Sequence, residues 1–246
     1  MRCVNERAKN TAMELDDDES LLFPCKILFV MTLPTARRPI EVVVFDLGGV
    51  LVDWNPRYLY RRLFEDDAAM ETFLSGICSP AWNERQDAGR SWHDATAELV
   101  ARYPDQTAMI TAYRQRWPEM LRGDMPETVK VLKELRQAGL RLYALTNWSH
   151  ETFPIARDRF PFLGWFDGIV VSGEERLIKP DPAIFHCLLN RYNIAPGRAV
   201  YIDDSPSNVS AAARIGFHSL HFVNVPRLRR ALIDLGLPIG SQEKAD

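Results

Sequence analysis

Four short polar motifs each follow an apolar run that predicts a buried strand. The motif residues are Asp46, Thr146 with Asn147, Lys179, and Asp203 with Asp204. Because the carboxyl ends of parallel strands meet at one edge of an open sheet, we expect these side chains to share one crevice. Three carboxylates, a hydroxyl group and a lysine would then lie together.

This set of side chains fits phosphoryl transfer. Clustered carboxylates repel one another unless a cation neutralises them, and an all-oxygen site without histidine or cysteine favours Mg²⁺. Lys179 would offset the charge of Asp46 and of a bound phosphate, and the Thr146 hydroxyl would hold phosphate oxygens. An ionised Asp46 in line with phosphorus can act as the nucleophile and form an aspartyl-phosphate.

Each motif alone also has an ordinary structural explanation. An Asp after a strand is commonly a turn or cap residue, and Asp203 with Asp204 can simply cap the following helix. A loop lysine such as Lys179 is usually solvated. The occurrence of all four motifs in order, each after a strand, favours the chemical interpretation.

The elements that must position these residues alternate regularly from residue 40 onward. Runs that are apolar throughout predict strands covered on both faces; they span 40–45, 142–145, 168–171, 199–202 and 219–223. Amphipathic patterns between them predict helices; they span 126–139, 181–192 and 207–215. This alternation predicts an α/β fold with a doubly wound parallel sheet.

One interval departs from the alternation. Residues 54–124 show helical patterns and no strand, whereas a crossover needs only about a dozen residues, so the interval is an insertion. It holds Trp54, Trp82, Trp92 and Trp117, four of the six tryptophans, which suggests a helical bundle with its own core. We therefore assign residues 39–53 and 125–246 to a core domain. Residues 1–38 are expected to be an extension that is disordered or reflects a mis-annotated start, with Met31 as a possible initiator.

Composition and charge exclude several classes of partner. The 246 residues are 46% hydrophobic and carry a net charge of −3, which gives no basic footprint for nucleic acid or an anionic membrane. The four cysteines form no C-x-x-C pair, so neither a zinc ribbon nor a redox dithiol is indicated. No apolar stretch near the start approaches the ~20 residues of a membrane span. We expect a cytoplasmic protein with a small-molecule partner, and the oligomeric state stays open.

Together the motifs resemble those of a known family. Asp46-Leu-Gly-Gly-Val, Leu145-Thr-Asn, Lys179-Pro-Asp-Pro-Ala-Ile-Phe and Ile202-Asp-Asp-Ser-Pro-Ser-Asn resemble the four motifs of the haloacid dehalogenase-like (HAD) hydrolase superfamily. The likeness covers about residues 40–225 and implies a HAD-like Rossmannoid core. The insertion at 54–124 resembles that superfamily's C1 cap, which closes over the active site and selects the substrate. The opening Phe-Asp-Leu-Gly-Gly-Val-Leu-Val-Asp is similar to the bacterial branch that contains α-D-glucose-1-phosphate phosphatase.

The resemblance implies a role for each motif residue. The implied catalytic residues are Asp46, as the nucleophile, Thr146 and Lys179. The implied substrate-binding residues are Thr146, Asn147 and Lys179. The implied Mg²⁺ ligands are Asp46, the Gly48 carbonyl, Asp203 and Asp204. Asn208 would orient the loop that carries the acidic pair.

Gly48 departs from the family pattern. Most family phosphatases carry a second Asp at this position, two residues after the nucleophile, where it protonates the leaving group and later activates water. Such general acid and base catalysis is worth about 10²–10⁴ in rate. A sugar 1-phosphate or an acyl phosphate has a more acidic leaving group and depends less on protonation. Asp53 is a conceivable substitute acid, although nothing in the sequence places its carboxylate.

Three functions remain in competition. The first is a Mg²⁺-dependent phosphatase for a small phosphorylated metabolite of the sugar phosphate class. The second is a metal-independent 2-haloacid dehalogenase, which the adjacent Asp203 and Asp204 disfavour because they would repel an anionic substrate. The third is a phospholigand-binding protein that lost turnover with the second Asp. Trp82, Arg85 and Asp87 are candidates for the insertion surface that faces the site.

Overall fold

The structure is a computed structural model, and it describes residues 39–240. The prediction for residues 1–38 therefore lies outside the described residues. Among the residues that are described, no helix is long and apolar enough to cross a membrane.

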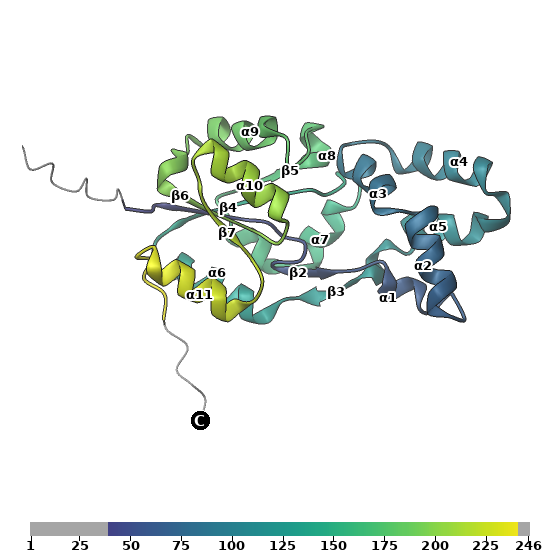
Figure 1. The fold of residues 1–246 in the computed structure, drawn as a ribbon, viewed down its shortest axis with the longest axis horizontal. Helices are drawn as coiled ribbons and strands as arrows, with labels where there is room; N and C mark the ends of the chain where they lie inside the picture. Colours follow the sequence, from purple (N-terminus) through teal and green to yellow (C-terminus); the bar gives the residue numbers. More distant parts are fainter. Residues whose placement is uncertain (1–38, 241–246) are drawn as a thin grey trace, which may run out of the picture. The chain divides into compact units, whose positions relative to one another are not determined.

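A five-stranded parallel sheet forms the centre of the fold, in the order β5-β4-β1-β6-β7 (Figure 1). Its strands are β1 (Val42–Phe45), β4 (Arg141–Thr146), β5 (Gly168–Val171), β6 (Ala199–Asp203) and β7 (His218–His221). The parallel sheet confirms the α/β prediction. The last strand ends two residues earlier than the apolar pattern suggested.

The central strand shows why its sequence is apolar throughout. Val43 and Phe45 pack into one hydrophobic cluster, while Val42 and Val44 pack into a second one. Side chains alternate between the two faces of a strand, so a strand with both faces covered needs apolar residues at every position.

Helices cover both faces of the sheet, as a doubly wound fold requires. Buried residues of α6 (Pro126–Gln137) and α11 (Val225–Asp234) join the first cluster, and those of α9 (Pro182–Tyr192) and α10 (Pro206–Ile215) join the second. The helices predicted from the sequence are thus confirmed. The shorter core elements are α7 (Phe153–Arg159), α8 (Ser172–Glu175), η3 (Pro161–Trp165) and η4 (Pro196–Arg198).

The insertion is helical but is connected through a pair of antiparallel strands. Its elements are β2 (Val52–Trp54), α1 (Arg57–Tyr60), α2 (Asp67–Gly76), α3 (Pro80–Asp87), α4 (Trp92–Arg102), η1 (Pro104–Gln106), α5 (Thr107–Gln115), η2 (Trp117–Met120) and β3 (Leu121–Asp124). The expectation of no strand in residues 54–124 was wrong, since β3 pairs with β2. Within β3 only Leu121 is buried, so the strand carries no apolar pattern.

Helix α3 shows no helical pattern in the sequence. It buries only Trp82 and Gln86 and is otherwise polar, so it lacks the amphipathic pattern of a packed helix. Ser79 caps its first turn, accepting a hydrogen bond from the Trp82 N–H, and Pro80 opens it. These two residues were the available signal for a helix start.

Three aromatic residues of the insertion pack against one another and join the main hydrophobic core. Trp82, Trp92 and Tyr113 pack together with ring centroids 5.2–5.5 Å apart. They belong to the same hydrophobic cluster as Val43 and Phe45, so the insertion does not have the separate core that was expected.

Candidate active site

Lys179 joins two carboxylates at the carboxyl edge of the sheet. Its Nζ lies 2.9 Å from Asp46 Oδ1 and 2.7 Å from Asp203 Oδ2, and its side chain is only 1% exposed. The strand register pairs Phe45 with Ile202, which places the following residue, Asp46, beside Asp203. Burial alone would lower the pKa of Lys179, but the two carboxylates raise it, so the ammonium group stays charged.

Asp203 is fully buried and already accepts several hydrogen bonds. The Tyr201 hydroxyl donates to its Oδ2 at 2.5 Å, and the Ser205 N–H donates to its Oδ1 at 2.8 Å. Asn208 Nδ2 lies 3.1 Å from both carboxylate oxygens. Although burial alone would raise the pKa of Asp203, Lys179 and these donors hold it below its ordinary value.

The negative charge of Asp46 is less well compensated than that of Asp203. Besides Lys179, the backbone N–H of Leu47 donates to Asp46 Oδ1 at 2.7 Å. Burial raises the pKa of this carboxyl, and Lys179 lowers it. The charges of Asp203 and Asp204 raise it further. The anionic form of Asp46 therefore needs more positive charge nearby than the lysine supplies.

Asp204 completes a cluster of three carboxylates. One oxygen from each of Asp46, Asp203 and Asp204 lies within 4.8 Å of the other two. Burial raises the pKa of Asp204, and the charge of Asp203 adds to it. Three carboxylates and one lysine leave a net negative charge in the site. The donor atoms are all oxygens, which fits a hard divalent cation such as Mg²⁺.

Gly49 allows this approach of Asp204. Its φ is +71°, and a Cβ built on it would lie 2.2 Å from Asp204 Oδ2. Only glycine combines the left-handed backbone with the space that the carboxylate occupies.

Thr146 and Asn147 end the neighbouring strand. Thr146 is buried at the end of β4, whose register with β1 pairs Phe45 with Ala144 and brings Thr146 to the same edge as Asp46. The side-chain amide of Asn147 accepts a hydrogen bond from the Lys179 N–H at 2.9 Å and donates one to the Lys179 carbonyl at 3.0 Å. Asn147 therefore positions the loop that carries the lysine, and the substrate contact expected for it stays a prediction.

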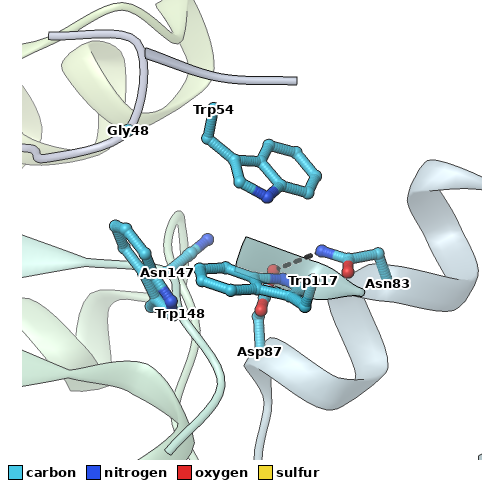
Figure 2. Close-up of a pocket in the computed structure, with 7 residues that line it drawn as sticks. All are labelled: Gly48, Trp54, Asn83, Asp87, Trp117, Asn147 and Trp148. Atoms are coloured by element: carbon cyan, nitrogen blue, oxygen red, sulfur yellow. Dashed lines mark hydrogen bonds between the residues drawn. The ribbon is translucent and has the colours of Figure 1, made fainter. Parts of the chain in front are cut away.

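A cavity of about 70 Å³ lies beside these residues, between the motif loops and the insertion (Figure 2). Its lining residues are Gly48, Trp54, Asn83, Asp87, Trp117, Asn147 and Trp148. Of the three candidates named for the facing surface, only Asp87 lines this cavity. Trp82 packs inside the insertion, and Arg85 is exposed.

The family model for haloacid dehalogenase-like hydrolases matches residues 40–216. The chain belongs to this family. The likeness inferred from the four motifs is thereby confirmed for this hydrolase at the level of the superfamily, while the C1 class of the insertion and the glucose 1-phosphate branch stay predictions.

Three relatives of this hydrolase illustrate the range of the family. Sesquiterpene phosphatase astK of Aspergillus oryzae is 26% identical over 184 residues, 75% of this chain and 90% of the relative. The phosphorylated carbohydrates phosphatase of Thermotoga maritima is 24% identical over 185 residues, 74% of this chain and 85% of the relative. Mouse acyl-CoA dehydrogenase family member 10 is 32% identical over 220 residues, which are 82% of this chain but 19% of that longer protein.

Two solved structures share the fold. A HAD family enzyme from Bacteroides thetaiotaomicron, solved as a magnesium complex, aligns with a TM-score of 0.62 and 19% identity over 78% of this chain and all of the other. L-2-haloacid dehalogenase from Xanthobacter autotrophicus aligns with a TM-score of 0.53 and 16% identity over 81% of this chain and 85% of the other. At these identities the comparisons show the shared architecture alone.

Two further sequence features of the hydrolase take no part in the cavity. The Asp53 carboxylate accepts hydrogen bonds from the Tyr58 hydroxyl at 2.8 and 2.9 Å and does not line the cavity, so it is a poor substitute acid. His218 and His221 each place Nε2 against a backbone carbonyl, that of Gly197 and that of Asp204. They do not form a metal-binding pair.

No sequence pattern indicated most of the residues that line the cavity. Trp54, Asn83, Trp117 and Trp148 come from β2, α3, η2 and the loop after β4, and no spacing rule links them. They meet only because the insertion returns to the motif loops.

Proposed function

We propose that this hydrolase is a Mg²⁺-dependent phosphatase that cleaves a small phosphorylated metabolite through an aspartyl-phosphate on Asp46. One observation carries the proposal: the Asp46 carboxyl is held by Lys179 within 4.8 Å of the Asp204 carboxylate, beside a cavity that can receive an organic group. A nucleophilic carboxylate needs this combination of fixed position and nearby positive charge.

Asp46, the Gly48 carbonyl and Asp204 are the proposed Mg²⁺ ligands. When bound there, Mg²⁺ would neutralise the carboxylates and draw electron density from a phosphoryl oxygen. Asp203 was expected to be a ligand as well, and it remains within reach. Because its oxygens already accept bonds from four groups, we assign it chiefly to holding Lys179 and the Asn208 helix in place.

The protein groups then act in two steps. In the first, an Asp46 oxygen bonds to phosphorus and the bond from phosphorus to the leaving oxygen breaks, while Lys179 and Thr146 bind the phosphoryl oxygens. In the second, water bonds to phosphorus and the bond to Asp46 breaks, which releases inorganic phosphate and restores the carboxylate. The leaving oxygen gains one proton and the attacking water loses one.

The lining of the cavity supports a small organic substrate of the sugar phosphate class. The indole rings of Trp54, Trp117 and Trp148 offer flat apolar faces, and Trp54 Nε1 and Trp148 Nε1 are buried donors without a partner among the described residues. A ring that carries hydroxyl groups would satisfy both features. The Thermotoga maritima relative, named for phosphorylated carbohydrates, agrees with this class.

A panel of phosphorylated metabolites, assayed for phosphate release with and without Mg²⁺, tests the proposal. We expect EDTA to lower release at least tenfold and added Mg²⁺ to restore it, because the carboxylate cluster then regains its counter-charge. Halide release from a 2-haloacid that persists in EDTA would instead favour the dehalogenase function. A phosphoenzyme that forms and never discharges would favour the ligand-binding function.

Replacing Gly49 by Ala is expected to impair Mg²⁺ binding. The new Cβ would occupy the place of Asp204 Oδ2, so the carboxylate must move and the affinity for Mg²⁺ should fall by about 10- to 100-fold. Isothermal calorimetry with Mg²⁺ measures this directly. Gly139→Ala is the matched control, since Gly139 also has a positive φ of +80° but its Cβ would meet no atom within 4 Å. Equal Mg²⁺ affinity in the two variants would contradict the assignment.

A further inference from the structure

The proposed reaction needs a proton donor, and the space around the leaving group restricts which residue can supply it. An alkoxide is a poor leaving group unless an acid protonates it as the bond to phosphorus breaks. A Cβ built on Gly48 would meet no atom within 4 Å, so this side of the cavity is open. The acid must therefore come from another part of the lining.

Asp87 is the one titratable side chain among the seven residues that line the cavity. It is the last residue of α3, and Figure 2 shows its carboxyl group extending toward Trp117 and Asn83, on the insertion side of the cavity. Asn83 Nδ2 donates a hydrogen bond to Asp87 Oδ2 at 2.8 Å. One oxygen is thus held by the helix.

The backbone of Asp87 is tied to the same loops that carry the motif residues. The Ser172 hydroxyl donates to the Asp87 carbonyl at 2.5 Å, and the Trp148 N–H donates to the Ser172 hydroxyl at 2.8 Å. The end of α3 is therefore fixed relative to the loop of Asn147 and Trp148. A general acid requires such fixed placement near the substrate.

The environment of Asp87 suits proton transfer near neutral pH. Burial raises the pKa of its carboxyl to about 7, the charge of Glu84 adds to the rise, and a backbone hydrogen bond from Ser149 opposes it. Two further groups face it: the Asn83 amide of the same helix, and the buried Tyr113 phenol of α5. Burial raises the pKa of Tyr113, and the Asp87 charge raises it further. Both protonation states of Asp87 are thus accessible during turnover.

We propose that Asp87 is the general acid and base of this hydrolase, supplied by the insertion across the cavity from Gly48. The inference rests on the proposed phosphatase function. As the bond between phosphorus and the leaving oxygen breaks, the Asp87 carboxyl gives that oxygen its proton. The resulting carboxylate then takes a proton from the water that attacks the phosphorus of phospho-Asp46, and so returns to its acid form.

Asp87→Asn tests this role, because the amide keeps the size of the side chain but cannot transfer the proton. Benzyl phosphate and p-nitrophenyl phosphate have similar shapes, and only the first needs a protonated leaving group. In single-turnover experiments we expect the first-turnover rate to fall by about 10²- to 10⁴-fold for benzyl phosphate and less than about threefold for p-nitrophenyl phosphate. With p-nitrophenyl phosphate, a burst of one p-nitrophenolate per site should precede slow turnover, because discharge of phospho-Asp46 has lost its base.

Two further variants separate proton transfer from structure. Gly48→Asp in the Asp87→Asn background places a carboxyl group in open space and should restore first-turnover cleavage of benzyl phosphate at least tenfold. Asp94→Asn, at an exposed aspartate of the next helix α4, should leave both rates unchanged.

The outcomes that contradict the inference are distinct from those that contradict the proposed function. An equal loss for both phosphates, or no loss for either, would overturn the role of Asp87 while leaving the phosphatase intact. Absence of Mg²⁺-dependent phosphate release by the unmodified protein would overturn the proposed function, and with it the role of Asp87.

Discussion

Asp46→Asn is expected to lower phosphate release by about 10⁴-fold or more, as removal of a covalent nucleophile does in other enzymes. The amide has the size of the carboxyl group and can still accept the bond from the Leu47 N–H, but it cannot form the bond to phosphorus. Phosphate release and phosphoenzyme formation, followed with the best substrate of the panel, both measure the loss.

The stability of this variant serves as its control. Because Asp46 is a buried carboxylate whose pKa is raised, its neutralisation relieves an unfavourable charge, and Lys179 keeps its partner Asp203. We expect the free energy of unfolding in urea to change by less than about 2 kcal/mol. Activity within tenfold of the unmodified protein would show that Asp46 is not the nucleophile.

Lys179→Met is expected to have the largest effect on stability, a loss of about 3–5 kcal/mol, because it leaves two buried carboxylates without their counter-charge. Without the lysine, the pKa of Asp46 in the folded protein rises further above its value in the unfolded chain, and the pKa of Asp203 loses the main influence that holds it down against burial. A group with a raised folded pKa loses stability as pH rises, so the penalty should be greatest at alkaline pH and shrink toward acid.

Urea unfolding at an acidic and an alkaline pH measures this dependence. Lys133→Met is the matched control, since Lys133 is exposed on α6, and its loss should change the free energy of unfolding by less than about 0.5 kcal/mol. A stability loss that is equal in the two variants, or that does not vary with pH, would contradict the buried charge network.

Much of the core could be predicted because its strands are covered on both faces and therefore appear in the sequence as runs of apolar residues. The same reasoning placed Asp46, Thr146 and the acidic pair at one edge of the sheet, because the carboxyl ends of parallel strands lie at the same edge. Lys179 illustrates the limit, because a loop lysine is ordinarily solvated. Its complete burial depends on two carboxylates that come from other strands.

The insertion was less accessible to prediction for physical reasons. β3 buries a single residue, and α3 presents a mostly polar surface, so neither shows a hydrophobic period. The sequence named Asp87 only as a candidate for the surface that faces the site. Its position, half-buried at the end of α3 against Ser149 and Ser172, depends on chain segments far along the sequence.

The hydrogen bonds between the insertion and the motif loops also affect how ligands pass. Any movement that widens the cavity by lifting α3 and α4 breaks the bond from the Ser172 hydroxyl to Asp87 and the bond from the Trp92 indole N–H to the Ser149 hydroxyl, which is 3.0 Å long. In the proposed phosphatase, where bond cleavage at phosphorus is fast, the breaking of these two bonds would limit turnover. Ser149 and Ser172, which do not line the cavity, would thereby affect the rates of ligand entry and exit.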